Sequence, residues 1–342
     1  MERSYLFAPG HNAKLLDRVF AAGADAVMLD LEDAVPPAQK AAARRVVAAA
    51  LANAPVERRT GAAPSDPPAT ARKATAGVDV PPAARRADAA PADPPAGPRR
   101  MVAQADPPAA PRRAAADLDV PPAARRPADV ASAPPRAWVR VNAARTDLCA
   151  ADLDAVAADA YGIRIPKAES PEDVAWVAAR APGKPIICAI ESARGLLAAA
   201  EIAAAPGVAH LAMGGVDLQR DLGTDGSDTA ALYARSHLVV CSRAARIGPP
   251  IDSVYPRLAD DDGLRLQAEL ARSLGFFGKS AIHPRQLPVL HAVFTPTEQE
   301  LAWAREVLAA FEAADGGAVA LPDGEFVDLP VARRAERLLA RA

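Results

Sequence analysis

The chain has 342 residues, a formal net charge of −2 and an aromatic content of only 4%. This composition argues against a nucleic-acid partner, because such partners need a basic surface and stacking aromatic side chains. It also argues against a disulfide-stapled or membrane-spanning protein, since the three cysteines lack CxxC spacing and the apolar runs fall short of about 18 residues. We therefore expect a cytoplasmic protein with neither a membrane nor a nucleic-acid partner.

Short apolar runs alternate with stretches of helical periodicity along most of the chain. The apolar runs predict strands over 4–8, 25–31, 137–141, 162–166, 186–190, 209–213, 249–254 and 278–282. The periodic stretches predict helices over 13–22, 36–51, 147–160, 171–180, 193–204, 228–246, 261–274, 297–313 and 330–340. Strands that alternate with helices over about 250 residues are typical of a (β/α)8 TIM barrel. We assign this α/β barrel to 1–53 and 137–295, and we expect a C-terminal helical lid over 296–342.

Residues 54–136 interrupt this alternation with a segment rich in proline, alanine and arginine. The sequence DVPPAARR begins at Asp79 and is repeated from Asp119. The segment is also poor in large apolar residues, since Leu118 is its only leucine. Such a composition buries too little apolar surface to offset the entropy of ordering, roughly 1–2 kcal/mol per residue. We expect a disordered low-complexity insertion on the barrel face opposite the active site, serving either as a spacer or as a proline-rich docking segment for a partner.

Two acidic residues follow apolar strands that flank a predicted helix. Glu191 comes directly after the strand 186–190, and Asp217 comes shortly after the strand 209–213. In a parallel α/β architecture the carboxyl ends of the strands carry the catalytic groups. Two carboxylates meeting there predict a hard divalent cation, with Mg²⁺ as the expected cofactor and with substrate and water as its other ligands. The alternative is that both acids cap helices at strand-to-helix turns.

One predicted strand carries a charged residue in its middle. Arg140 lies between Val139 and Val141, so its guanidinium points to the face opposite theirs, inside the predicted barrel. A buried guanidinium needs anionic partners, and near the end of the barrel Arg140 would hold a substrate carboxylate or a developing enolate oxygen. The alternative is a structural ion pair with Asp30 or Glu32.

An acidic cluster closes the second predicted strand. Alternation places Asp30 and Glu32 on one face, and Asp33 follows them. The negative charges of these carboxylates exceed the single positive charge of Arg140. They therefore predict either a nearby cation or a shell of hydrogen-bonded side chains that orients the ligands of a metal ion. Lys167, in the sequence IPKAES, would balance one of these acids, either as part of the site or as a structural pair.

Several of these stretches occur together in one known family. They are RSYLFAPG, GADAVMLDLEDAV, WVRVNA, IRIPKAES, AIESARGL, LAMGGVDLQRDLG, GFFGKSAIHPRQ and FVDLP. In this order they resemble the citrate lyase β-subunit-like branch of the HpcH/HpaI aldolase superfamily, which contains CoA-ester lyases. The resemblance covers nearly all of the chain except residues 54–136, and it implies a (β/α)8 barrel with Mg²⁺ on Glu191 and Asp217.

The resemblance also implies how a substrate is held. Arg140 is expected to contact substrate oxygens, and the loop with Phe7, Pro9 and Gly10 is expected to lie along the thioester arm of CoA. Asp328, in the sequence FVDLP, is expected to reach the active site of a neighbouring subunit and to transfer a proton at the acyl-CoA methyl carbon. The usual assembly of the family implies a homotrimer or a hexamer built as a dimer of trimers.

The implied reaction is cleavage of malyl-, citramalyl- or citryl-CoA into acetyl-CoA and a 2-oxo acid, or the reverse condensation. A 3-hydroxy-3-carboxy acyl-CoA chelates Mg²⁺ through its carboxylate and hydroxyl, which eases loss of the hydroxyl proton. Two alternatives stay open from the sequence. One is an aldolase that acts on free 2-oxo-4-hydroxy acids without CoA, and the other is a catalytically idle barrel that presents the proline-rich segment to a partner.

Overall fold

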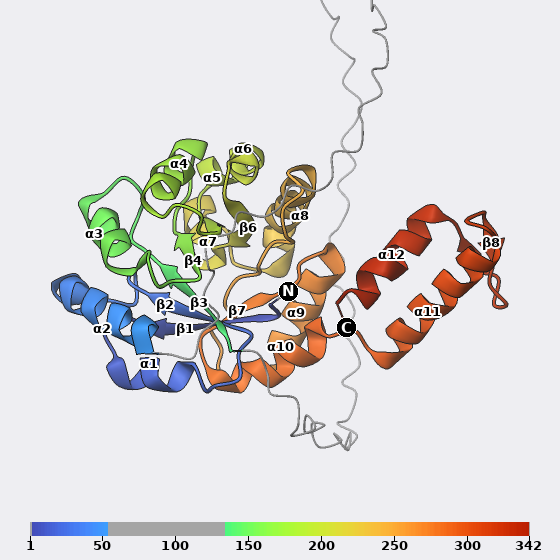
Figure 1. The fold of residues 1–342 in the computed structure, drawn as a ribbon, viewed down its shortest axis with the longest axis horizontal. Helices are drawn as coiled ribbons and strands as arrows, with labels where there is room; N and C mark the ends of the chain where they lie inside the picture. Colours follow the sequence, from blue (N-terminus) through green and yellow to red (C-terminus); the bar gives the residue numbers. More distant parts are fainter. Residues whose placement is uncertain (1, 54–133, 342) are drawn as a thin grey trace, which may run out of the picture. The chain divides into compact units, whose positions relative to one another are not determined.

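A computed structural model describes residues 2–53 and 134–341 of the chain, so the predicted insertion lies, up to residue 133, outside the described residues. The centre of the fold is a curled seven-stranded sheet in which all neighbouring strands are parallel (Figure 1). The strands are β1 (Ser4–Pro9), β2 (Ala26–Asp30), β3 (Arg136–Arg140), β4 (Gly162–Ile165), β5 (Ile186–Ile190), β6 (Val208–Met213) and β7 (Lys279–Ala281). Their order is β6-β5-β4-β3-β2-β1-β7. Each of them begins within one residue of a predicted strand.

The strand predicted over 249–254 is reduced to two isolated bridges. Ile251 pairs with Ala212 of β6, and Asp252 pairs with Lys279 of β7, both in parallel. Two prolines come just before these residues, and because proline has no N–H donor for a strand ladder, no longer strand forms. The two bridges nevertheless link β6 and β7, the edge strands of the sheet.

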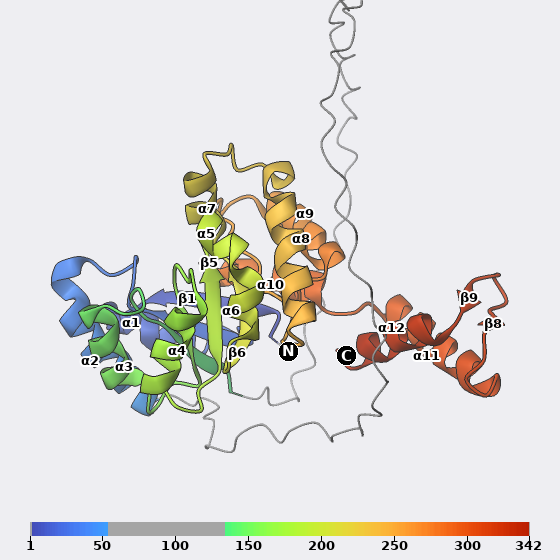
Figure 2. The ribbon, with the colours of Figure 1, turned by 90° about the horizontal axis from the view of Figure 1, so that it is seen from above.

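Helices follow most of the strands and cover the outer side of the sheet (Figures 1 and 2). They are α1 (Ala13–Val19), α2 (Lys40–Asn53), α3 (Asp147–Val156), α4 (Pro171–Arg180), α5 (Ala193–Leu197), α6 (Ala199–Ala204), α7 (Gly215–Leu222), α8 (Asp228–Ala244), α9 (Asp261–Leu274) and α10 (Leu287–Phe294), with 3-10 turns at Pro37–Gln39 and Pro284–Gln286. The helix predicted over 193–204 breaks at Ala198. No element was predicted for α7 or α10. Helix α7 begins with consecutive glycine and valine residues and ends at Gly223, whose left-handed φ of 65° terminates it.

The sheet separates two apolar layers. Side chains such as Val27 and Leu29 of β2 point outward and pack against the helices, whereas Met28 points into the curl of the sheet. Asp30, the last residue of β2, shares the inward face with Met28. The fold therefore brings polar side chains to the carboxyl end of an apolar interior.

A fully buried ion pair lies where residue 252 meets β7. Asp252 Oδ2 lies 2.5 Å from Lys279 Nζ, and both side chains are 0% exposed. Asp252 Oδ1 also accepts a hydrogen bond from Arg235 Nε of α8 at 3.2 Å, and Lys279 Nζ donates to Gln267 of α9. The pair thus joins the bridged segment to β7 and to two outer helices.

The C-terminal segment has a small core of its own. Helices α11 (Glu298–Ala313) and α12 (Leu329–Leu339) pack together, in agreement with the two helices predicted there. An unpredicted hairpin, β8 (Val319–Ala320) and β9 (Phe326–Val327), connects them. Within the described part of the chain, every helix is too short or too polar to cross a bilayer.

Candidate active site

A cavity of about 320 Å³ opens at the carboxyl ends of the strands. Several residues singled out in the sequence line it: Phe7, Pro9, Asp30, Arg140, Glu191 and Asp217. The other predicted site residues are not part of its lining: Gly10, Glu32, Asp33, Lys167 and Asp328. The parallel sheet therefore collects side chains from distant parts of the sequence around one cavity.

Glu191 is a buried carboxylate at the end of β5. It is 5% exposed, and its Oε2 atom has no hydrogen-bond partner among the described residues. Burial raises the pKa of its carboxyl to about 7, although the positive charge of Arg164 opposes this shift. A carboxylate that is kept from water without a partner is expected to take up a cation or a proton.

The residue beside Glu191 makes room for this carboxylate. Ile190 of β5 pairs with Met213 of β6, which sets Glu191 next to Gly214. A Cβ atom on Gly214 would lie 2.1 Å from Glu191 Cγ. Any larger residue at this position would therefore displace the acid.

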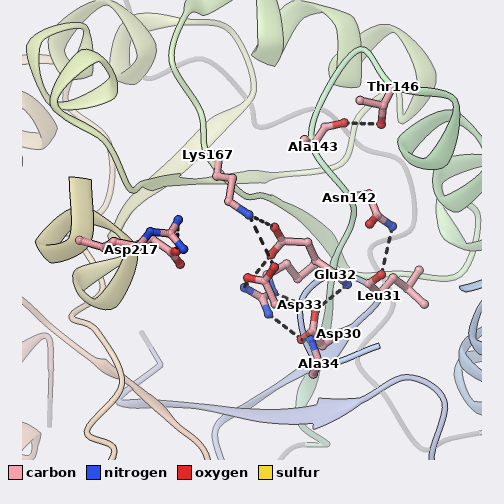
Figure 3. A network of polar contacts seen from close by, with 12 residues as sticks. Asp30, Leu31, Glu32, Asp33, Ala34, Asn142, Ala143, Thr146, Lys167 and Asp217 are labelled. Carbon is pink, nitrogen blue, oxygen red and sulfur yellow. Dashed lines mark hydrogen bonds and ion pairs between the residues drawn. The ribbon is translucent and has the colours of Figure 1, made fainter. Parts of the chain in front are cut away.

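Asp217 lies in the first turn of α7, which begins at Gly215. Its Oδ1 atom pairs with Arg220 Nη2 of the same helix at 2.9 Å, and its side chain is 27% exposed. Figure 3 shows Asp217 across the site from the pair formed by Lys167 and Glu32. Because an exposed pair within one helix holds a carboxylate only weakly, Asp217 is free to bind a stronger cation.

Arg140 ends β3 and is held by the acids predicted to surround it. Its Nε and Nη2 atoms donate to the two carboxylate oxygens of Asp30 at 2.8 and 2.6 Å. Its Nη1 atom lies 2.8 Å from Glu32 Oε2 and 3.5 Å from Asp33 Oδ2. The structural ion pair considered from the sequence is therefore present, and the expected contact with a substrate stays a prediction.

Lys167 lies at the rim of the site. Its Nζ atom is 2.5 Å from Glu32 Oε1 and 3.6 Å from Asp33 Oδ1, and its side chain is 40% exposed. Its backbone adopts a left-handed φ of 50°, which is unfavourable for a residue other than glycine and indicates that its contacts hold it in place. Lys167 thus balances Glu32 from outside the cavity lining.

Arg164 is a cavity residue that the sequence reasoning missed. It lies in β4 in register with Arg140 of β3, it is 4% exposed, and it lines the cavity. A signal was present, because Arg164 stands between Ile163 and Ile165 as Arg140 stands between two valines. The alternation that turns Arg140 inward applies equally to Arg164.

Two predicted residues make local contacts outside the cavity lining. Asp328 is the N-cap of α12, and its Oδ1 atom accepts a hydrogen bond from the Val331 N–H at 3.3 Å. Gly10 donates its N–H to the Asp30 carbonyl oxygen at 2.7 Å, and a Cβ atom on Gly10 would lie 2.6 Å from that oxygen. Gly10 therefore holds the loop after β1 against the end of β2.

The donor set of the cavity fits a hard cation. Glu191 has an oxygen without a partner, and Asp217 is held only by an exposed pair. Among residues 2–53 and 134–341, no three histidine, cysteine or acidic side chains gather as a metal site. A cation here would have two protein carboxylates and would take its other ligands from substrate and water, which suits Mg²⁺.

Comparison with known proteins confirms the resemblance found in the sequence. The model of the HpcH/HpaI aldolase/citrate lyase family matches residues 3–65 and 101–284. A (3S)-malyl-CoA thioesterase of Cereibacter sphaeroides is 40% identical over 208 residues, which cover 60% of this chain and 73% of that protein. The citrate lyase subunit beta of Escherichia coli K12 is 30% identical over 357 residues, which cover 99% of this chain and 93% of that protein.

Solved structures agree with the fold. The crystal structure of the protein CitE from Mycobacterium tuberculosis in complex with magnesium, acetoacetate and coenzyme A has a TM-score of 0.66 at 30% identity, covering 99% of this chain and 97% of that chain. A citrate lyase beta subunit from the same organism, complexed with oxaloacetate and magnesium, has a TM-score of 0.57 at 26% identity, covering 86% of this chain and 97% of that chain. The family model, the relatives and the fold agree, and the chain belongs to the HpcH/HpaI aldolase/citrate lyase family.

Proposed function

We propose that this protein is a Mg²⁺-dependent carbon–carbon lyase. Its substrate is a 3-hydroxy-3-carboxy acyl-CoA of the malyl-, citramalyl- or citryl-CoA type, which it cleaves to acetyl-CoA and a 2-oxo acid or forms by the reverse condensation. The observation that carries this proposal is the unpartnered carboxylate of Glu191, buried in one cavity with two arginines. The magnesium, coenzyme A and oxo acids bound in the solved relatives support it.

The scaffold that we propose for this chemistry is a (β/α)8 barrel. The seven strands, together with the bridged residues Ile251 and Asp252 that link β6 and β7, would supply the eight positions of such a ring. In such a barrel the carboxyl ends of the strands form the active site. Glu191 and Arg140 lie at the carboxyl ends of β5 and β3, which supports this arrangement.

Glu191 and Asp217 are the residues that would hold the Mg²⁺ ion. When bound, the ion polarises the hydroxyl and carboxylate oxygens of the substrate and stabilises the negative charge that develops there. Glu191 is kept from bulk water by burial, so its charge acts on its surroundings with little screening. Asp217 adds the second carboxylate from α7, and Gly214 leaves the space that the Glu191 side chain occupies.

Arg140 would stabilise the anion formed during cleavage. The substrate hydroxyl gives up its proton, the bond between C2 and C3 breaks, and its electron pair becomes the enolate of acetyl-CoA. Protonation of the enolate at carbon gives acetyl-CoA, while C3 becomes the carbonyl carbon of the 2-oxo acid. Asp30 accepts the Nε–H and one Nη2–H of Arg140, and Nη1 is paired with Glu32, so one N–H on each Nη atom is left for a substrate oxygen.

Asp328 of a neighbouring subunit would supply the proton to the enolate. Within its own chain Asp328 caps α12 and is not part of the cavity lining. A homotrimer, or a hexamer built as a dimer of trimers, would bring α12 of one subunit to the site of the next. Phe7 and Pro9, which line the cavity, and the adjoining Gly10 would lie along the thioester arm of CoA.

A second candidate function is hydrolysis of the thioester. One observation favours it, the 40% identity to a (3S)-malyl-CoA thioesterase. Hydrolysis releases free CoA and leaves the hydroxy acid intact, whereas the lyase releases acetyl-CoA and a 2-oxo acid. The products therefore distinguish the two reactions.

The test is a paired product assay on the purified full-length protein. Malyl-, citramalyl- and citryl-CoA are supplied separately with Mg²⁺, and the 2-oxo acid and the free thiol are followed in parallel. The lyase proposal expects 2-oxo acid without free thiol from at least one substrate, lost with EDTA and reduced at least about 100-fold in Glu191→Gln. Free thiol alone would support the thioesterase. Neither product from a folded protein would refute both and would favour the CoA-independent aldolase or the idle barrel.

A further inference from the structure

Arg164 carries a charge that the described part of its own chain does not neutralise. Its side chain is 4% exposed. It forms no ion pair or hydrogen bond with the described residues, and its Nε and Nη1 atoms are buried without a partner. The neighbouring Arg140, by contrast, is paired with Asp30 and Glu32. Burying a guanidinium without an anionic partner is unfavourable in free energy, so this cavity lacks a negative group that would neutralise Arg164.

The groups around Arg164 do not supply that anion. Its guanidinium lies over the ring of Phe7, 5.3 Å from the ring centroid, a contact that favours a cation but does not neutralise it. Burial, reinforced by the positive charge of Arg140, lowers the pKa of Arg164 to about 10, so the group is still charged at neutral pH. Glu191, Asp30 and Glu32 attract Arg164, but Glu191 is the residue proposed to hold the metal ion, and Asp30 and Glu32 are already paired with Arg140.

Besides Glu191 and Arg164, a further buried polar group in the same cavity lacks a partner. Ser280 of β7 is 2% exposed, and its hydroxyl makes no hydrogen bond with the described residues. Ser280 and Arg164 both line the cavity of about 320 Å³. Buried polar atoms are normally satisfied, so two unsatisfied groups in the lining of one cavity, in addition to Glu191, indicate a polar ligand. A carboxylate, with two acceptor oxygens, is a ligand that a guanidinium fork recognises well.

We propose that Arg164 binds a second carboxylate of the substrate and thereby selects an acyl-CoA of the citryl type. This inference rests on the proposed lyase function, in which the first carboxylate and the hydroxyl are committed to the metal ion at Glu191 and Asp217. The remaining substituent at C3 is hydrogen in malyl-CoA, methyl in citramalyl-CoA and carboxymethyl in citryl-CoA. Only carboxymethyl would neutralise Arg164, so the 2-oxo acid handled here is a dicarboxylate of the oxaloacetate class.

The test compares oxaloacetate with pyruvate, two 2-oxo acids that differ by this carboxylate. Binding of each acid to the full-length protein with Mg²⁺ is measured by titration calorimetry. The wild type is expected to bind oxaloacetate at least about 10-fold more tightly than pyruvate. Arg164→Met should weaken oxaloacetate binding at least about 10-fold and pyruvate binding less than about threefold. Arg164→Lys, which keeps the charge but loses the fork, should retain part of the preference.

Equal affinity of the wild type for the two acids would overturn the inference, whether or not the Arg164 variants fold. An equal loss of affinity for oxaloacetate and pyruvate in Arg164→Met would also overturn it. Arg164 would then bind the carboxylate that the two acids share, or stabilise the fold. In both cases, Mg²⁺-dependent binding of a 2-oxo acid leaves the proposed function standing. If the wild type binds neither acid with Mg²⁺, the proposed function fails and takes the inference with it.

Discussion

Gly214 and Glu191 follow directly after β6 and β5, and the missing side chain of the glycine gives the Glu191 carboxylate its place. A Cβ atom on Gly214 would stand 2.1 Å from Glu191 Cγ and 2.9 Å from its Oε1 atom. The φ angle of Gly214 is −91°, which other residues adopt freely, so its backbone conformation does not require glycine. Space for the acid requires it.

We expect Gly214→Ala to displace Glu191 and to lower Mg²⁺ affinity about 10- to 100-fold, the usual effect of disturbing a group that orients a metal ligand. Titration calorimetry with Mg²⁺ measures the affinity, and circular dichroism checks that the fold is kept. The matched control is the double variant with Glu191→Gln. Because both substitutions act on one carboxylate, the second should add little to the first. If the losses of Mg²⁺ affinity in the two single variants simply add in the double variant, a positioning role for Gly214 is contradicted.

The buried pair of Asp252 and Lys279 predicts a large effect on stability. Asp252→Asn would leave the Lys279 ammonium, which is 0% exposed, without its anion, and we expect a loss of about 3–5 kcal/mol in the free energy of unfolding. Asp228→Asn is the matched control, because Asp228 also pairs with Arg235 but has a side chain 43% exposed. The free energy of unfolding of Asp228→Asn should fall by less than about 1 kcal/mol. Urea unfolding followed by circular dichroism measures both, and equal losses would show that burial is not what makes the pair important.

The strands were predictable from the sequence because each is an apolar run bounded by turn residues or a charge. The direction of their side chains followed from the same alternation, which turns Val139 and Val141 toward the outer helices and Arg140 inward. Arg164 obeys that rule as well, so it was overlooked rather than unpredictable. The position of each strand, and the face to which each of its side chains points, could therefore be predicted from the sequence.

Contacts between distant strands were not available in this way. Lys279 meets Asp252 only because the sheet curls until Ile251 bridges to β6 and Asp252 bridges to β7. The space that Gly214 leaves for Glu191 depends on the register of β5 against β6. Neither the register nor the curl is encoded in a local pattern, because both follow from packing along the whole sheet.

The ion pair of Asp25 with Arg3 predicts acid sensitivity at the amino end of β1. Arg3 donates to both carboxylate oxygens of Asp25 at 2.7 Å, and it also bonds Thr295 after α10. Burial alone would raise the pKa of Asp25, but the hydrogen bonds and the charge of Arg3 hold the pKa below its ordinary value of 3.8. The pKa is therefore lower in the folded than in the unfolded chain. The stability that the pair contributes is complete above about pH 4 and is lost as the pH falls through the folded pKa.

Asp25→Asn isolates this contribution from the titration of the other carboxyl groups. Near pH 6 the wild type should be more stable than the variant by about 1–3 kcal/mol, the usual value of hydrogen bonds to a charged group. The margin should shrink as the pH falls below 3.8, because the carboxyl is protonated first in the unfolded chain and then, at a lower pH, in the folded one. Urea unfolding of both proteins across this range measures it, and a margin that stays constant with pH would contradict the assignment.

Asp328 is not part of the cavity lining of its own chain, so its proposed action on a neighbouring site can be tested with two inactive variants. Asp328→Asn keeps an N-cap for α12, because asparagine caps helices as well as aspartate does, but it removes the acid. We expect its turnover to fall at least about 100-fold, within the range of a lost general acid. Glu191→Gln loses a metal carboxylate instead and is expected to be similarly inactive.

Co-expression of the two variants should restore part of the activity. A subunit with Asp328→Asn keeps Glu191, and a neighbour with Glu191→Gln keeps Asp328, so their shared site would contain both wild-type acids. With random assembly of equal amounts, about a quarter of the sites would be complete, because each of the two conditions holds for half of the subunits. The control is each variant expressed alone under the same conditions. A mixture no more active than its components would show that Asp328 does not act between subunits, because random assembly must create complete sites if it does.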